Sequence, residues 1–279
     1  MKEVLALTND TATLAKGFLT PSPDTMESMA NSLLEEFDIE TRLSAARALL
    51  RMNNSEVIEL LTKAMEDENY IFRAKLVKII SKLNYAQITN AIIKAINDED
   101  SYVRKSAIEA SKKNYDPKIT AAIIQSINDD EINVRESAVI ALGSRCDEEV
   151  IEALITALAD PHWSVRMEAV EALSKINSPR VIESISKMLN DKDSEIRRSA
   201  LVAIGNLDPE KIIPEATKAL KDPDLSVQSE SLYLLGKNGN LATISTLEDL
   251  LHHGSEMIKK EASRAIARIR ERAAARNEV

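Results

Sequence analysis

Aspartate and arginine side chains recur at a fixed spacing through this sequence, and they are its most regular groups able to form strong polar interactions. A forked guanidinium group binds a carboxylate through two parallel hydrogen bonds. We therefore predict a structural ladder between repeats, and we set aside an anion-binding site because a ladder explains the period without a ligand. The ladder residues are Asp67, Asp98, Asp129, Asp160 and Asp191, each followed six positions later by Arg73, Arg104, Arg135, Arg166 or Arg197.

The residues that most often perform catalysis or bind metal are few. The three histidines are His162, His252 and His253, and none lies at a metal-binding spacing such as H-E-x-x-H. We place His252 and His253 in a solvated loop, and His162 at a helix start. Cys146 is the single cysteine, at an expected turn, and we interpret it as a surface thiol. The sequence thus predicts no catalytic residue, no metal ligand and no cofactor.

The aspartates and arginines belong to sequence units of constant length, and residues at the same place in successive units form what we call a column. Val165-Arg166 has counterparts at 41–42, 72–73, 103–104, 134–135, 196–197, 227–228 and 258–259, always 31 residues apart. Within each unit the apolar spacing has a helical period twice, which predicts two helices joined by a tight turn. In the fifth unit we expect helices over about 163–176 and 180–189. A constant period of this kind indicates a stack of helical pairs.

Two further columns of polar residues lie where the first helix of each unit is expected to begin and to end. Side chains that can cap the first helix of each unit are Asp38, Asn69, Asp100, Asp193, Asp224 and Ser255. Basic side chains near the end of each first helix, where the backbone dipole favours cations, are Arg51, Lys82, Lys113, Lys175, Lys237 and Arg268. A basic ridge for phosphate is the other interpretation of the second column, but the net charge of −9 disfavours it.

The repeated pattern D-x-D-x-x-V-R-x-x-A-x-x-A-L, present from Asp191 through Ile204, resembles the short HEAT-like repeats of the phycobilisome-lyase type. The resemblance covers about 36–270 and implies an all-α, right-handed α-solenoid of stacked two-helix repeats. We expect one solenoid over 1–279, with a degenerate N-terminal capping repeat at 1–40, regular repeats at 41–256 and an Arg-rich C-terminal capping helix at 257–279. In the first segment we expect a short helix over 11–18, then a helix with Met26, Ala30, Leu33 and Leu34 on one face.

The second helices carry the functional signal. The resemblance implies that they line the concave face, where extended partners bind. One column of these helices places isoleucine in three consecutive units where flanking units have polar residues, as at Thr62 and Ser186. The isoleucines either widen the buried stripe or form a partner-binding strip. The candidate partner-binding residues are Asn90, Ile93, Ile124, Gln125 and Ile155.

The charge of the C-terminal segment and the composition of the whole chain limit the kinds of partner that we expect. From Met257 to Val279 there are seven basic and three acidic residues, so this segment suits either a polar solenoid cap or contact with an acidic partner or another subunit. An acidic chain with a single Trp disfavours nucleic-acid binding. No apolar run is long enough to span a membrane, and no secretion signal is evident. We expect a monomeric cytoplasmic protein.

These observations predict a non-enzymatic scaffold or adaptor that binds another protein of unknown identity. The phycobilisome-lyase resemblance implies the alternative, which is a bilin lyase subunit or a chromophore-handling chaperone. A nucleic-acid-binding HEAT-like protein is the third and least favoured alternative.

Overall fold

The computed structural model describes residues 23–52, 55–83 and 85–275, and these contain helices and no β-strand. The helices of the first part are α2 (Pro23–Glu35), α3 (Ile39–Leu50), α4 (Ser55–Ala64), α5 (Tyr70–Ile80), α6 (Tyr85–Ile96), α7 (Ser101–Ala110), α8 (Pro117–Gln125), the 3-10 helix η1 (Ser126–Asn128) and α9 (Ile132–Leu142). Those of the second part are α10 (Glu148–Ala157), α11 (Trp163–Leu173), α12 (Pro179–Lys187), the 3-10 helix η2 (Met188–Asn190), α13 (Ser194–Leu207), α14 (Ile212–Ala219), α15 (Leu225–Asn238), α16 (Thr243–His253) and α17 (Glu256–Ala275).

In most repeats the first helix begins at a side-chain cap. Asp38 accepts a 2.7 Å hydrogen bond from the Thr41 amide, and Asp100 accepts one of 2.8 Å from Tyr102. Such caps satisfy amides that have no partner within the helix. At His162 the imidazole takes the same position and accepts from the amide of Ser164. The predicted capping column, including the histidine, is confirmed.

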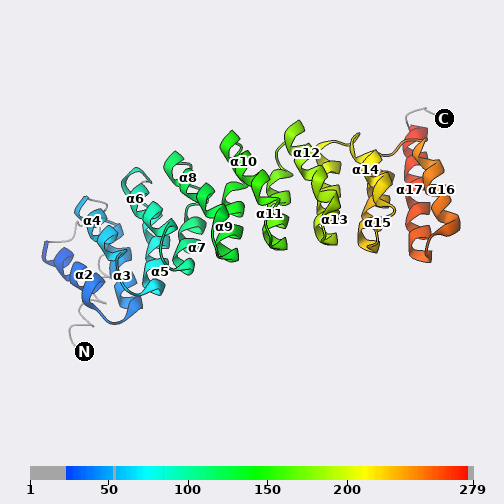
Figure 1. The fold of residues 1–279 in the computed structure, drawn as a ribbon. Coiled ribbons are helices and arrows are strands. Elements are labelled where there is room, and N and C mark those ends of the chain that lie inside the picture. Colours follow the sequence, from blue (N-terminus) through cyan, green and yellow to red (C-terminus); the bar gives the residue numbers. More distant parts are fainter. Residues whose placement is uncertain (1–22, 53–54, 84, 276–279) are drawn as a thin grey trace. The chain divides into compact units, whose positions relative to one another are not determined.

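The chain divides into two compact units, residues 1–141 and 142–279. In the first unit, α3, α5 and α7 pack in sequence, and α4, α6 and α8 pack in sequence beside them. Figure 1 shows these two layers, with α4, α6 and α8 on one side and α3, α5 and α7 on the other. In the second unit, first helices α11, α13, α15 and α17 pack in sequence in the same way. The predicted all-α solenoid of two-helix repeats is confirmed.

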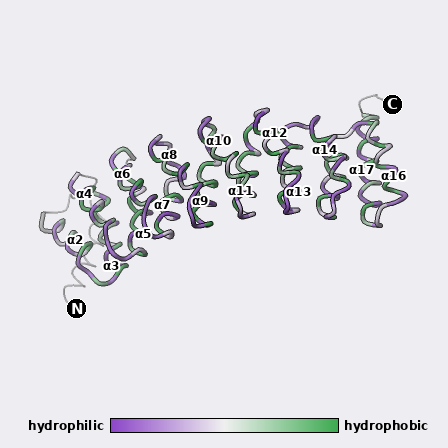
Figure 2. Tube along the Cα trace, viewed as in Figure 1, coloured by the Kyte–Doolittle hydropathy of each residue, from purple (hydrophilic) through white to green (hydrophobic). Residues whose placement is uncertain are grey.

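Apolar residues of the helices meet between the two layers and form the core. In Figure 2 apolar and polar residues alternate along each helix with a helical period. Small residues allow neighbouring first helices to approach closely. A Cβ on Gly236 of α15 would lie 3.0 Å from the Cα of Ala265 in α17, so only glycine fits this contact without movement of backbone.

Near the ends of the chain, one expected helix lies outside the described residues and two other predictions need correction. The helix expected over 11–18 lies outside the described residues. The expected apolar face of Met26, Ala30, Leu33 and Leu34 is wrong in part, since α2 buries Met29 and Leu33, four positions apart, and leaves Leu34 exposed. The expected loop position of His252 and His253 is also wrong, because α16 continues to His253 and ends only at Gly254.

Helix α17 packs against α15 and α16 and bonds to the end of α15. Arg272 donates hydrogen bonds of 2.9 Å and 2.5 Å to the carbonyl oxygens of Gly236 and Gly239. These two residues lie at the end of α15, where backbone carbonyls have no partner within the helix. A side chain of α17 therefore caps the C-terminal end of its neighbour α15.

Candidate functional site

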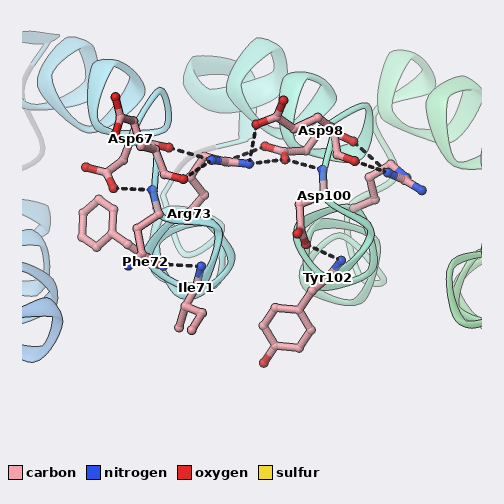
Figure 3. Close-up of polar contacts among 11 residues, drawn as sticks. Asp67, Ile71, Phe72, Arg73, Asp98, Asp100 and Tyr102 are labelled. Atoms are coloured by element: carbon pink, nitrogen blue, oxygen red, sulfur yellow. Dashed lines mark hydrogen bonds and ion pairs between the residues drawn. The ribbon is translucent and has the colours of Figure 1, made fainter.

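The aspartate and arginine columns meet between consecutive repeats. Arg73 of α5 donates from Nε and Nη2 to the two carboxylate oxygens of Asp98, at 2.9 Å and 2.6 Å. Its Nη1 donates to the backbone carbonyl of Asp67 at 2.7 Å. The carboxylate partner thus comes from the next repeat, 25 positions later, whereas the aspartate six positions earlier accepts through its backbone. Figure 3 shows Arg73 lying between these two loops.

The same geometry recurs in both units. Arg104 bonds to Asp129 with two contacts of 2.7 Å, and Arg197 bonds to Asp222 with the same two distances. Arg42 forms an earlier rung with Asp67. In the next-to-last aligned repeat Gln228 replaces arginine and keeps only the backbone contact, with a 2.7 Å bond to the carbonyl of Asp222. Each full rung joins two repeats by a bidentate ion pair and a backbone hydrogen bond.

Arg135, the third arginine of the predicted ladder, forms backbone contacts within its own unit. Arg135 donates from Nη1 to the backbone carbonyls of Asp129 and Asp130, at 2.8 Å and 3.0 Å. In the second unit Asp160 accepts a 2.8 Å hydrogen bond from the amide of His162, and its backbone carbonyl accepts from Arg166 at 3.0 Å. Arg135 and Asp160 therefore form the same contacts within their own units as the corresponding ladder residues of other repeats.

The rungs are largely shielded from solvent. The side chains of Arg166 and Asp191 are 5% and 7% exposed, so loss of either partner would leave a buried charge. The hydrogen bond from Arg197 lowers the pKa of the Asp222 carboxyl below its ordinary value of 3.8. For Asp191, burial raises the pKa, but the hydrogen bonds from Arg166 and from the backbone outweigh burial and the net shift is downward. The geometry stabilises the fold and offers no open anion-binding position.

Acid should destabilise the protein through these carboxylates. An aspartate whose pKa is lower in the folded chain stabilises the fold above its unfolded pKa, and this contribution is lost as pH falls through the folded pKa. The lowered pKa values of Asp67, Asp129, Asp191 and Asp222 place the loss below about pH 3.8. We expect the urea midpoint to fall steeply from pH 4 to pH 2. A midpoint equal at pH 2 and pH 6 would contradict this role of the ladder.

The predicted partner-binding residues lie on second helices, with partly exposed isoleucines. In the first unit Ile93 of α6 and Ile124 of α8 are half-buried, and Asn90 and Gln125 beside them are exposed. These two helices are in contact. In the second unit Ile155 of α10 is half-buried as well. The structure therefore places all five side chains within reach of solvent, and the isoleucines contribute to the core only in part.

The polar residues of the same column show how the fold tolerates them. Thr62 donates its hydroxyl to the carbonyl of Ile58 at 2.8 Å, and Thr217 bonds in the same way to Ile213. Ser186 donates to Ile182 at 2.7 Å. A hydroxyl at this position therefore needs no hydrogen-bond partner outside its own helix. The fold does not require isoleucine at positions 93 and 124.

The other candidate chemical groups form no reactive cluster. Among the described residues no group of three or more His, Cys, Asp and Glu side chains could hold a metal ion. Cys146 is exposed. In the part of the chain that the structure describes, no helix has both the length and the apolar character needed to cross a membrane.

Sequence reasoning missed one group of exposed residues. Tyr70 and Tyr102 lie in the first turns of α5 and α7, and about half of each side chain is exposed. The available signal was that large aromatic residues occupy columns that hold serine elsewhere, at Ser101 and Ser164.

The stacked pairs and the polar ladder between them define an all-α solenoid, a class whose members bind partners along extended surfaces. The family model for HEAT repeats matches residues 26–112, 61–130, 119–205 and 182–267. The chain therefore belongs to the HEAT-repeat family. A comparison with curated protein sequences finds no match.

Solved structures share this fold. YibA from Escherichia coli is 23% identical, aligns with 91% of this chain over 99% of its own, and gives a TM-score of 0.57. Kap95p, whose binding is described as inducing the switch loops of RanGDP to adopt the GTP-bound conformation, is 13% identical. It aligns with 89% of this chain over 40% of its own, with a TM-score of 0.62. At these identities the likeness establishes the fold alone.

Proposed function

We propose that this protein is a non-enzymatic scaffold that binds another protein across its second helices, with Ile93 and Ile124 in the centre of the contact. The single observation that carries the proposal is that these two isoleucines are only half-buried on neighbouring helices of one unit. The same column holds threonine in other repeats, with its hydroxyl satisfied internally. An apolar pair that the fold does not require is typical of an interaction surface.

The surroundings of the pair support a protein partner. Asn90 and Gln125 are exposed and uncharged, and they can donate and accept hydrogen bonds at the rim of an apolar contact. Lys94 next to Ile93 already pairs with Glu66 at 2.6 Å. Solenoids present extended surfaces of this kind, and Kap95p, which has the same fold, binds RanGDP.

The double substitution Ile93→Thr with Ile124→Thr should separate binding from folding. Each threonine can bond to the carbonyl four residues earlier, so we expect a loss of about 1 kcal/mol or less per site in the free energy of unfolding. Loss of two central apolar contacts should weaken partner binding at least about tenfold. Urea denaturation measures the first quantity, and capture of native-cell proteins on the immobilised full chain, followed by titration of the captured protein, measures the second.

A matched control is available on the first helices. Ile140 of α9 is 40% exposed, and Ile140→Thr makes the same chemical change away from the proposed surface. The control should retain the partner that the double variant loses. If the double variant and the control capture the same proteins with the same affinity, the second-helix face is not the binding surface.

A further inference from the structure

Large apolar side chains gather at one edge of the first unit, where the first helices begin. Tyr70 and Ile71 of α5, Tyr102 of α7 and Ile132 of α9 are 45%, 37%, 49% and 37% exposed. The two tyrosine rings lie 6.4 Å apart and nearly perpendicular. In Figure 3 the Ile71 and Tyr102 side chains point to the same side, away from the ladder. We call these four residues and the acidic loops beside them the acidic–aromatic edge.

The fold does not need large side chains at these positions. Tyr70 has Ser101 and Ser194 as counterparts in other repeats, and Tyr102 has Ser164 and Ser226. Helices α7 and α13 begin with Ser101 and Ser194, and an aspartate caps each of them at the position where Asn69 caps α5. An exposed aromatic cluster that a repeat can replace by serine indicates an interaction surface.

The loops of this edge carry a high density of negative charge. Every residue of 98–100 and of 129–131 is acidic, as are Asp67 and Glu68. The ladder uses Asp67, Asp98 and Asp129, so Glu68, Asp130 and Glu131 remain as exposed carboxylates at the helix starts.

Nearby side chains leave this negative charge largely unneutralised. Glu99 is 88% exposed, although it lies 3.4 Å from Arg73. Lys75, the next cation along α5, pairs with Glu40 at 2.6 Å. The edge therefore combines aromatic faces with uncompensated negative charge.

We propose that the acidic–aromatic edge binds an extended, arginine- and lysine-rich segment of a partner protein. Carboxylates attract the cationic side chains, and the tyrosine rings bind guanidinium groups through cation–π contacts. Neighbouring first helices are about 10 Å apart and an extended chain advances about 3.3 Å per residue, so about three residues span one repeat. A segment of about ten residues with regularly spaced cations would contact α5, α7 and α9.

The second unit lacks this combination. At the corresponding loops it has Pro161, Lys192 and Pro223 in the positions of Glu68, Glu99 and Asp130. Trp163 and Leu225 are exposed there, at 50% and 48%, but without adjacent acidic runs. Charge complementarity therefore assigns the cationic segment to the first unit.

The probe is a fluorescein-labelled ten-residue peptide of alternating arginine and glycine, titrated into the full chain and followed by fluorescence anisotropy. We expect saturable binding that weakens as salt rises, because exposed charges are screened. The double variant Tyr70→Ser with Tyr102→Ser should bind about tenfold more weakly. The control Tyr115→Asn removes a tyrosine that is 62% exposed in the loop between α7 and α8, beyond the C-terminal end of α7, and it should bind as the wild type does.

A second pair of variants separates this edge from the bulk charge of the molecule. Glu68→Gln with Glu131→Gln should weaken peptide binding, whereas Glu56→Gln with Glu59→Gln, which removes the same charge from exposed positions of α4, should not. Equal effects of the two pairs, an unchanged affinity of the tyrosine variant, or no binding to the wild type would each overturn the proposal. It would also be overturned if sedimentation showed salt-sensitive oligomers that the tyrosine variant abolishes, since the occupant would then be the Arg-rich α17 of a second copy.

Discussion

Replacement of Arg166 by alanine is expected to lower the free energy of unfolding by about 3–4 kcal/mol, because it leaves the carboxylate of Asp191 buried without its cation. Asp191 is 7% exposed, and Arg166 donates to both of its oxygens at 2.7 Å and 2.8 Å. The same substitution also removes the hydrogen bonds to the carbonyls of Asp160 and Pro161. Urea denaturation at pH 7, fitted with a common slope for all variants, measures the change.

Two further variants test whether the ladder is the cause. Arg166→Gln imitates the natural residue Gln228, which keeps a backbone contact, so it should cost less than alanine. Lys175→Ala removes a cation that is 59% exposed and lies 3.6 Å from Glu171, and it should cost about 0.5 kcal/mol or less. If the arginine and lysine variants lose similar, small amounts of stability, the buried ladder does not stabilise this unit.

Phe72→Ala is expected to cost about 3–5 kcal/mol, the range typical of removing a fully buried aromatic ring. Phe72 is completely buried in α5, and the guanidinium carbon of Arg42 lies 3.8 Å from the centre of its ring. Arg42 also donates to the carbonyl of Leu33 at 2.8 Å. The ring therefore fills the core and supports the first rung of the ladder. Thermal and urea denaturation of the full chain report the loss.

The conservative change Phe72→Leu distinguishes volume from the cation–π contact. Counterparts of Phe72 in the first unit include Val103 and Val134, so an aliphatic residue suits the position. Phe72→Leu keeps most of the volume and should cost about 1–2 kcal/mol, part of it from the lost contact with the guanidinium group. A cost for Phe72→Ala that is no larger than that for Phe72→Leu would show that the ring does not fill the core as the structure indicates.

The helical pairs were predictable from sequence because the information is local and repeated. The cap at Asp100 and its 31-residue counterparts mark the helix starts, and apolar residues with helical period mark the buried faces. The helix-start position of His162 followed from its alignment with aspartates, although histidine is an uncommon cap. Because the same signal recurs in each unit, several weak local preferences together predict the helices strongly.

The pairing of the ladder depends on distances through space that sequence spacing does not reveal. The aspartate nearest in sequence to Arg73 is Asp67, yet the carboxylate that it binds is that of Asp98, because the side chain crosses to the next loop. The exposure of a side chain also depends on neighbours that are distant in the sequence. Leu34 aligns with buried residues such as Met65 and Ile96 but is itself exposed. The half-burial of Ile124 likewise depends on how far α8 is covered by its neighbours.

Every full rung joins side chains 25 positions apart within a period of 31 residues, and its two partners are chemically the same at each joint. Loss or duplication of one whole period inside a unit therefore leaves an aspartate opposite each arginine. Recombination between repeats can change the length of the array without new compensating mutations at the joints. The number of repeats is then free to vary over evolutionary time, whereas a surface confined to particular repeats, such as that of Tyr70 and Tyr102, is gained or lost as a block.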